Sequence, residues 1–324
     1  MRENLPNLII GGVFKAGTTS LFSYLSAHQK IAISSKKELG YFVPLQFDQG
    51  LPPLEEYTKY FTHIETPNDF AYILEASPGY LYGGQKVARM MQKVLGEFKV
   101  IFILREPKSR LYSFYEYLKS NYVHAYASRL KQDQITFINE MTYESYCRAS
   151  LDYYRSGKNN IENDYFLSGI KYGLYYRFLK EWFEVLDSKN IKIVFLENME
   201  EYPKETMLEI CEWLNIPSGF YESYEYKVQN KTQFAKWEWL HKMALTINRQ
   251  LEPFFRKNLY IKDFLKKVYF SLNKKETHQE TLGFETSTEV SDLFNEENLL
   301  LKNFLEKQKY SHSNFPQWLK ESGQ

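Results

Sequence analysis

The sequence predicts an α/β fold of three layers, in which a central, mainly parallel sheet of five strands lies between helices. Five short apolar runs rich in β-branched residues indicate the strands. Helical patterns follow several of these runs, and such alternation favours parallel strands joined by helical crossovers. The first run enters a glycine-rich loop of the P-loop-like kind. The predicted strands are residues 7–12, 30–34, 71–75, 99–104 and 191–196.

Three predicted helices follow predicted strands. The first begins near Thr18, and the second begins near Pro107, a residue favoured in the first turn of a helix. The third begins at Pro203, and each of the three has an apolar stripe at helical spacing. Ligands of such sheets bind at the carboxyl ends of the strands, where the loops before these helices lie.

The length of 324 residues, 44% of them hydrophobic, is enough for one large core. We expect a single domain over residues 1–324, with a core at about 7–235 and a helical, basic C-terminal extension at about 236–324. Residues 121–164 have a loosely amphipathic helical pattern and are expected to form an insertion over the sheet.

The net charge, the cysteines and the first apolar run indicate which binding partners and which cellular compartment to expect for the protein. A net charge of +1 gives no global field for a polyanion, so no nucleic-acid partner is expected. Cys147 and Cys211 form no metal-binding spacing, which favours a reduced chain without a metal. The first apolar run is too short for a signal peptide or a membrane span, so with Met1 as the natural start we expect a cytoplasmic protein.

The loop after the first predicted strand is an anion site with an unusual lysine. Gly12 and Gly17 have the spacing of the pattern G-x-x-x-x-G-K-[ST], but Thr18 stands where that pattern has lysine, and Lys15 lies inside the loop. Backbone N–H groups, hydroxyls and a helix N-terminus still converge on one negative group. This combination indicates a phosphorylated donor other than ATP.

A second segment has the chemistry to hold another phosphate. Arg105 ends the strand at residues 99–104, and Ser113 follows eight residues later inside the next helix. An arginine gives bidentate, charge-assisted hydrogen bonds to phosphate, and a serine hydroxyl adds one more. By itself, Arg105 could equally form a salt bridge at the end of a strand. Together with the Lys15 loop it favours a site for two phosphates.

The two segments together resemble the sulfotransferases that use 3′-phosphoadenosine 5′-phosphosulfate (PAPS). Residues 15–21 match that family's loop K-x-G-T-[ST]-x-L, and residues 104–113 match its 3′-phosphate motif L-R-x-P-x-x-R-x-x-S. Gly173-Leu174-Tyr175 with Trp182, and the strand before Glu197 and Pro203, add to the resemblance. It covers roughly residues 7–235 and is closest to the carbohydrate-type branch, which includes the heparan sulfotransferases.

The resemblance implies PAPS as co-substrate, adenosine 3′,5′-bisphosphate (PAP) as product, and no metal. Lys15 is then a catalytic residue that neutralises charge on the oxygen between phosphate and sulfur. Lys231, in a late basic loop, is expected to close over the phosphates, although a solvated turn explains it equally well. The residues expected to bind the donor are Lys15, Ala16, Gly17, Thr18, Thr19, Ser20, Arg105, Ser113, Tyr175 and Lys231.

Glu38 is the catalytic base that the resemblance implies. The carbohydrate-type branch has a K-E-x-x-[FY]-F segment after the second strand, which residues 37–42 match. A carboxylate beside a bound hydroxyl can take its proton during attack on sulfur. The alternative for Glu38 is a surface Lys-Glu pair. Since the cytosolic branch uses a histidine as base, His28, His63 and His124 remain rival candidates.

The acceptor is the least determined part. Where many relatives have Glu-Lys-[Ser/Thr]-Pro after the third strand, this chain has Glu75-Ala76-Ser77-Pro78, so the substrate-side lysine is missing. Ala76 and the near-neutral charge argue against a strongly sulfated polymer. We expect transfer to a hydroxyl, or as second choice an amine, of a carbohydrate or a small natural product.

Two other functions fit parts of the sequence. A P-loop small-molecule kinase would need lysine at position 18 and an aspartate where Arg105 ends its strand. Residues 227–275 carry twelve lysines and arginines among aromatic residues, a pattern that suits RNA or a membrane surface as well as a solvated helical lid.

Overall fold

The computed structural model describes residues 4–122, 131–157, 165–227 and 280–323, together with 234–235, 265 and 274–275. Its central sheet has five strands in the order β2-β3-β1-β4-β5, and every pairing in it is parallel. The predicted α/β class is therefore confirmed, and every predicted strand end lies within one residue of the observed one. The strands are β1 (Leu8–Gly12), β2 (Ile31–Ile33), β3 (Tyr72–Ala76), β4 (Lys99–Leu104) and β5 (Ile191–Phe195).

The central strands are buried along their whole length because helices cover both faces of the sheet. All five residues of β1 are buried, and so are all residues of β4 after Lys99. A parallel sheet covered on both sides needs continuous apolar runs rather than alternating ones. This is the pattern that made the strands visible in the sequence.

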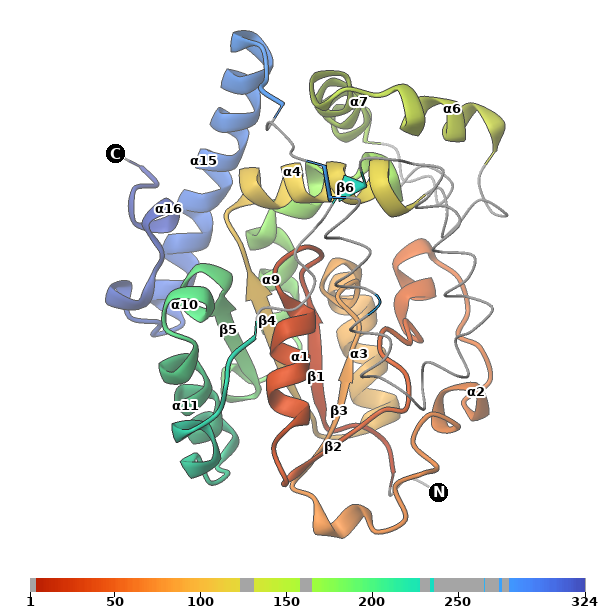
Figure 1. The fold of residues 1–324 in the computed structure, drawn as a ribbon, viewed down its shortest axis with the longest axis vertical. Coiled ribbons are helices and arrows are strands. Elements are labelled where there is room, and N and C mark those ends of the chain that lie inside the picture. Colours follow the sequence, from red (N-terminus) through yellow and green to blue (C-terminus); the bar gives the residue numbers. More distant parts are fainter. Residues whose placement is uncertain are drawn as a thin grey trace.

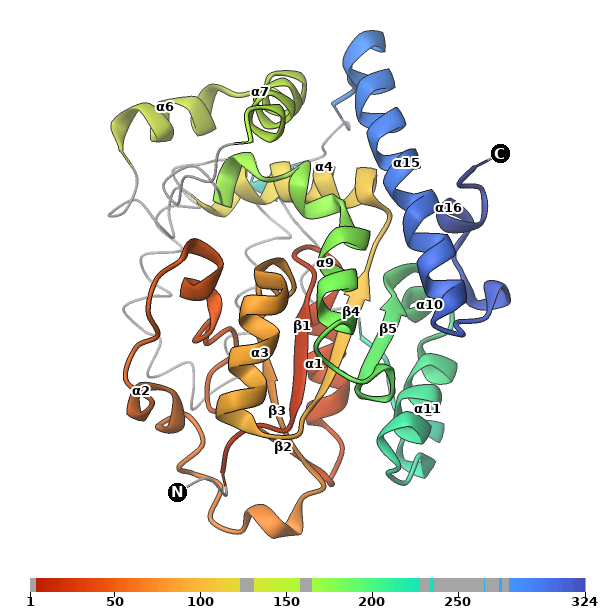
Figure 2. The same cartoon turned by 180° about the vertical axis from the view of Figure 1, so that it is seen from behind.

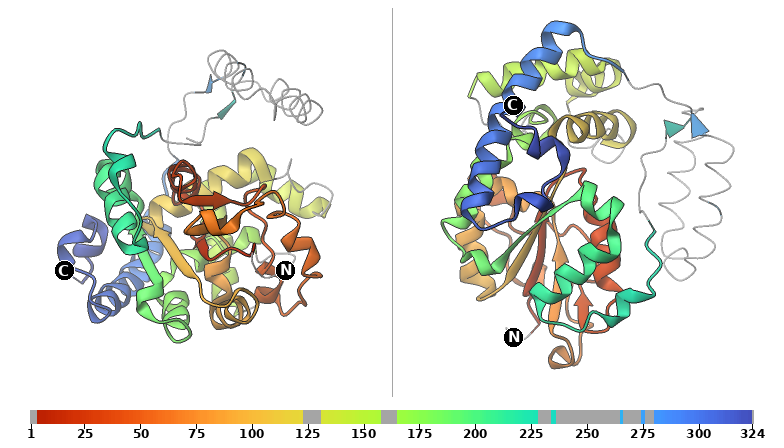
Figure 3. Two further views of the ribbon diagram at one scale, coloured as in Figure 1. Left: turned by 90° about the horizontal axis from the view of Figure 1, so that it is seen from below. Right: turned by 90° about the vertical axis from the view of Figure 1, so that its left-hand side faces the viewer.

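Two layers of helices flank the sheet. Helices α1 (Thr18–Ser26) and α11 (Pro203–Leu214) lie on one face, and α3 (Gly84–Leu95) and α9 (Tyr175–Phe183) lie on the other (Figures 1 and 2). Figure 3 shows the same layers from below and from the side. The helix starts expected at Thr18, Pro107 and Pro203 are all observed.

Trp182 is the main anchor of α9 on the sheet. Its side chain is fully buried, its Nε1 donates a hydrogen bond to the carbonyl of Leu81 at 3.0 Å, and its ring meets the edge of Phe102 in β4. Burying an indole of this size contributes strongly to the core, provided that its N–H finds an acceptor.

Helix α4 (Pro107–Tyr117) crosses beyond the carboxyl ends of the strands and carries the insertion (Figure 1). The described part of residues 121–164 is helical as predicted, with α6 (Gln132–Glu140) and α7 (Tyr143–Arg155). These helices pack on α4, which separates them from the sheet, and they share with α4 a second apolar core around Phe114 and Tyr146.

The described part of the C-terminal extension is helical but acidic. Helix α15 (Phe284–Lys307) lies beside α9, and residues 280–323 hold eight carboxylates against four lysines. Tyr310, after α15, completes the edge of β5: its hydroxyl accepts a hydrogen bond from the Ile193 N–H and donates one to the Ile191 carbonyl, both at 3.1 Å. The basic stretch at residues 227–275 lies almost wholly outside the described residues.

None of the helices in the described part of the chain combines the length and the apolar character needed to cross a bilayer.

Short elements connect the helices and strands given above. The remaining short elements are α2 (Glu55–Thr58), α10 (Leu196–Glu201), α16 (Gln317–Lys320), the 3₁₀ turns Val43–Phe47, Pro67–Asp69, Tyr80–Gly83, Lys171–Gly173, Ser188–Asn190, Gly219–Glu222 and His312–Asn314, the π turn Leu118–Tyr122, and the antiparallel pair β6 (Phe234–Ala235) and β7 (Lys274–Lys275).

Candidate active site

The loop between β1 and α1 depends on a glycine whose backbone conformation other residues rarely adopt. Gly17 is the N-cap of α1 with φ 81°, and a Cβ there would lie 2.6 Å from Leu196 Cδ1. The N–H of Val13 donates to the Ile103 carbonyl at 2.9 Å, which ties the loop to β4. No side chain caps the N-terminus of α1, and its first turn holds no acidic residue. The first N–H groups of the helix therefore remain available to an anion.

Lys15 lies in this loop beside Arg105. The Arg105 guanidinium donates to the Lys15 carbonyl at 3.1 Å, and the Lys15 ammonium lies 5.0 Å from the ring centroid of Tyr117. Burial, and next the positive charge of Arg105, lower the pKa of Lys15, while Glu116 and Glu38 act in the opposite direction. Two cations held together at the carboxyl ends of β1 and β4 create a strong local preference for an anion.

Arg105 is fixed through its backbone. The hydroxyl of Tyr175 donates to the Arg105 carbonyl at 2.8 Å, and the next N–H, that of Glu106, donates to Glu197 Oε1 at 2.8 Å. Tyr175 is fully buried, and its hydrogen bond positions the Arg105 carbonyl, while its predicted contact with the donor stays a prediction. Ser113 is half-buried on α4, the helix that begins directly after Arg105.

Glu38 reaches the site from the loop after β2. Its backbone has φ 60°, its N–H donates to the Ala76 carbonyl at 2.9 Å, and its side chain is 56% exposed. Lys37 links it to the donor loop: the Lys37 ammonium lies 3.0 Å from Glu38 Oε1 and 2.8 Å from Thr19 Oγ1. The candidate base and the candidate phosphate loop thus share one lysine.

A buried carboxyl supports the loop that carries Glu38. Glu75, with no exposed surface, accepts a hydrogen bond from Ser77 Oγ at 2.5 Å, and Ser77 Oγ accepts one from the Gly40 N–H at 2.9 Å. Burial raises the pKa of Glu75 to about 7. This chain of hydrogen bonds joins the end of β3 to the residues that follow Glu38.

The structure brings most of the predicted site residues to one edge of the sheet. Residues 15–20 follow the carboxyl end of β1, Arg105 follows that of β4, and Glu38, in the loop after β2, bonds to Ala76 at the end of β3. Figure 1 shows these strands side by side in the sheet. Ala16, Thr18 and Ser20 have buried side chains, so their backbone is what the loop offers. Lys231 lies outside the described residues.

The rival histidines are placed elsewhere or are not described. His28 is buried beyond the end of α1, where Nε2 lies 2.8 Å from the Pro217 carbonyl and Nδ1 accepts from the Lys30 N–H. His63 is exposed, and the carbonyl of its neighbour Ile64 accepts a hydrogen bond from the Asn4 side chain ahead of β1. Both therefore lie towards the amino ends of the strands, while His124 lies outside the described residues.

Sequence reasoning missed three side chains of the site. Lys37 was passed over for its neighbour Glu38, although both stand in the same matched segment. Glu116 and Tyr117 interact with Lys15 and follow Ser113 by three and four positions on α4. Residues at this spacing share one face of a helix, so the helical period from Ser113 was the signal that could have found them.

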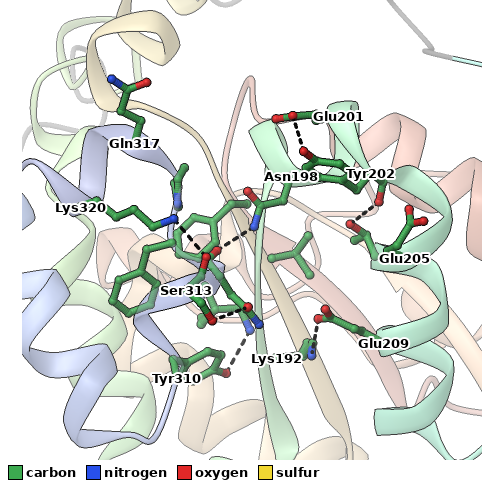
Figure 4. Close-up of a pocket in the computed structure, with 17 residues that line it drawn as sticks. Lys192, Asn198, Glu201, Tyr202, Glu205, Glu209, Tyr310, Ser313, Gln317 and Lys320 are labelled. Carbon is green, nitrogen blue, oxygen red and sulfur yellow. Dashed lines mark hydrogen bonds and ion pairs between the residues drawn. The ribbon is translucent and has the colours of Figure 1, made fainter.

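A separate cavity of about 490 Å³ lies between β5, α10, α11 and the C-terminal segment (Figure 4). None of the predicted site residues lines it. Glu201, Glu205 and Glu209 stand along one side of it, and Asn198 bridges it by donating to the Asn314 carbonyl. It lies beside the Tyr310 contact that completes the sheet edge. Within the described ranges, no group of three or more His, Cys, Asp or Glu side chains has the arrangement of a metal site.

Comparison with known proteins identifies the family. A model of the sulfotransferase domain matches residues 5–284. The chain belongs to the sulfotransferase family. A solved sulfotransferase from Alicyclobacillus acidocaldarius shares the fold, with a TM-score of 0.53 and 20% identity over 71% of this chain and 87% of the other.

Among curated relatives, a bifunctional heparan sulfate N-deacetylase/N-sulfotransferase 1 from Caenorhabditis briggsae is 25% identical over 69% of this chain and 24% of its own length. The membrane-associated sulfotransferase kil1 from Dictyostelium discoideum is 36% identical over 35% of this chain and 23% of its own. Carbohydrate sulfotransferase 15 from Mus musculus is 25% identical over 65% of this chain and 44% of its own. The chain thus spans about a quarter of the first two relatives and less than half of the third.

Proposed function

We propose that this sulfotransferase moves the sulfuryl group of PAPS to a hydroxyl, or as second choice an amine, of a carbohydrate or small natural product. The observation that carries the proposal is the convergence of Lys15, Arg105 and Glu38 at one edge of the sheet, beside the N-terminus of α1, where the N-cap makes no side-chain hydrogen bond. Two cations suit the two phosphates of the donor, and a carboxylate beside them suits a base.

Each group has one role in the proposed reaction. The N–H groups of residues 16–20 hold the 5′-phosphate, and Arg105 with Ser113 holds the 3′-phosphate, which ATP lacks. The acceptor oxygen forms a bond to sulfur as the bond from sulfur to the bridging phosphate oxygen breaks, and the electron pair stays on that oxygen. Lys15 stabilises the charge that develops there, and Glu38 takes the acceptor's proton.

The acceptor class is proposed from the relatives and from one departure in the chain. Two of the relatives carry heparan sulfate or carbohydrate sulfotransferase in their names, which favours a sugar acceptor. Ala76 is buried and leaves the loop after β3 without the lysine that many relatives have there. A neutral or weakly charged sugar, or a hydroxylated natural product, is therefore favoured over a polyanion. The cytoplasmic location and the single domain over residues 1–324 stay predictions.

Ligand-induced stabilisation separates this proposal from the kinase alternative. PAP should raise the melting temperature far more than ATP at equal concentration, because only PAP carries the 3′-phosphate. Equal shifts would favour a nucleoside triphosphate site and overturn the proposal. Labelled PAPS with a panel of hydroxylated and amino acceptors then identifies the receiving molecule.

A further inference from the structure

Lys37 joins two parts of the site that the reaction must bring together. Its ammonium donates to Thr19 Oγ1 on the donor loop and to Glu38 Oε1 on the candidate base. The Lys37 side chain is 21% exposed, against 56% for Glu38, so the lysine is held inside the site while the carboxylate faces outward. Its neighbour Lys36 is exposed and lies 5.9 Å from the ring centroid of Tyr60, away from this pair.

Lys37 is the cation that lies between Thr19 of the donor loop and Glu38. The end of β3 approaches Glu38 through the Ala76 carbonyl, and residues 76–80 contain no cation. Lys15 and Arg105 stand next to each other, and the negative charge of Glu116 acts on both, while Glu38 also acts on Lys15. Lys37 is thus the cation that links Thr19 of the donor loop to Glu38.

We propose that Lys37 recognises the sulfuryl group of the donor, and that it leaves Glu38 when it does so. This inference rests on the proposed function. A donor whose 5′-phosphate lies on the N–H groups of α1 carries its sulfuryl group past Thr19, where the Lys37 ammonium already donates a hydrogen bond. A charge-assisted bond to a sulfonate oxygen replaces the ion pair with Glu38.

The consequence is a link between donor binding and the base. Before the donor binds, Lys37 occupies Glu38 Oε1. Once Lys37 turns to the sulfuryl group, that oxygen is open to the acceptor's hydroxyl. The acceptor oxygen then attacks sulfur, the bond from sulfur to the phosphate oxygen breaks, and the proton goes to Glu38. The lysine remains on the transferring group and stabilises its negative oxygens.

The experiment compares PAPS with PAP, which lacks only the sulfuryl group. Equilibrium titrations of Lys37→Met should show PAPS binding weakened about tenfold or more, with PAP binding within about twofold of the wild type. Lys37→Arg should recover most of the loss, because a longer cation can still reach a sulfonate. Lys36→Met is the matched control and should leave both affinities unchanged. Turnover of Lys37→Met should fall by about 10²-fold.

Two outcomes overturn the inference. If Lys37→Met weakens PAPS and PAP equally, or neither, the lysine only supports the loop. If the double variant Lys37→Met/Glu38→Gln binds PAPS as the wild type does, repulsion from an unmasked Glu38 explains the loss, and Lys37 does not contact the sulfuryl group. Failure of the proposed function has a different signature, because the wild-type protein would then bind neither PAPS nor PAP.

Discussion

The two halves of the candidate site are built in different ways. The donor half, made of the loops after β1 and β4, is fixed by backbone contacts: the Val13 N–H to the Ile103 carbonyl, and the Arg105 guanidinium to the Lys15 carbonyl. The loops of the acceptor half, after β2 and β3, are also joined by the Glu38 N–H to the Ala76 carbonyl, but the Glu38 carboxylate itself is exposed and pairs with one lysine side chain. The cations of the donor half are therefore preorganised, whereas the Glu38 side chain can adjust to its substrate.

This contrast leads us to expect that changes in the donor half affect donor binding and chemistry together. Changes in the acceptor half should affect turnover or local stability and leave the binding of PAP intact. The following substitutions test the contrast.

Lys15→Ala should have the largest effect. It removes the cation that is closest to the breaking bond in the proposed reaction, and we expect turnover to fall by about 10³-fold. The melting temperature should change little, since burial already lowers the pKa of this lysine and its charge gains little from folding. Steady-state assays with labelled PAPS measure the loss, and Lys93→Ala, an exposed lysine on α3, is the control. Retained turnover would remove Lys15 from the donor site.

Glu38→Gln should come next, with turnover lowered by about 10²-fold and the affinity for PAP unchanged. The amide keeps the shape of the side chain but cannot take the acceptor's proton. Initial-rate assays and PAP titrations, run side by side, separate the two quantities. Glu56→Gln, an exposed glutamate in α2, serves as control. A normal rate would place the base elsewhere, and a loss of PAP affinity would join Glu38 to the donor half.

Arg105→Ala should weaken PAP binding by about 10- to 100-fold, as loss of a charge-assisted phosphate contact does. Tyr175→Phe should weaken it by less, because it removes only the hydrogen bond that positions the Arg105 carbonyl. Calorimetric titration gives both values. A larger loss for Tyr175→Phe than for Arg105→Ala would mean that the tyrosine, not the arginine, carries donor recognition.

Glu75→Gln should have the smallest effect, visible only in the pH dependence of stability. Burial raises the pKa of Glu75 from 4.5 to about 7 in the folded protein. The contribution of neutral Glu75 to the free energy of unfolding is thus full below pH 4.5 and is lost as the pH rises to about 7. The reason is that the carboxyl ionises at lower pH in the unfolded chain than in the folded protein. At pH 8 the variant should melt higher than the wild type by about 2–4 °C for each kcal/mol regained, with little difference at pH 4.5. A variant that is less stable at pH 8 would contradict the raised pKa.

The sheet and the donor half could be predicted from the sequence because both depend on short, local patterns. Buried parallel strands leave continuous apolar runs, and Gly17, Lys15 and Arg105 occur within segments whose spacing sets their geometry. Pro107 and Pro203 marked helix starts for an equally local reason.

The acceptor half could not be predicted to the same extent because its geometry depends on contacts between distant segments. That Lys37 reaches Thr19, eighteen positions earlier, follows from the packing of the loop after β2 against α1. The burial of Tyr175 and its hydrogen bond to the Arg105 carbonyl depend on how α9 docks on the sheet. That the insertion packs on α4 rather than on the sheet likewise depends on tertiary packing.

Calorimetric titration of the wild-type protein with PAP and with ATP tests the donor assignment most directly. Two phosphate positions, one at Lys15 and one at Arg105, should give PAP at least about tenfold higher affinity than ATP. Equal affinities, or no binding of PAP, would contradict the assignment of this site to a sulfuryl donor.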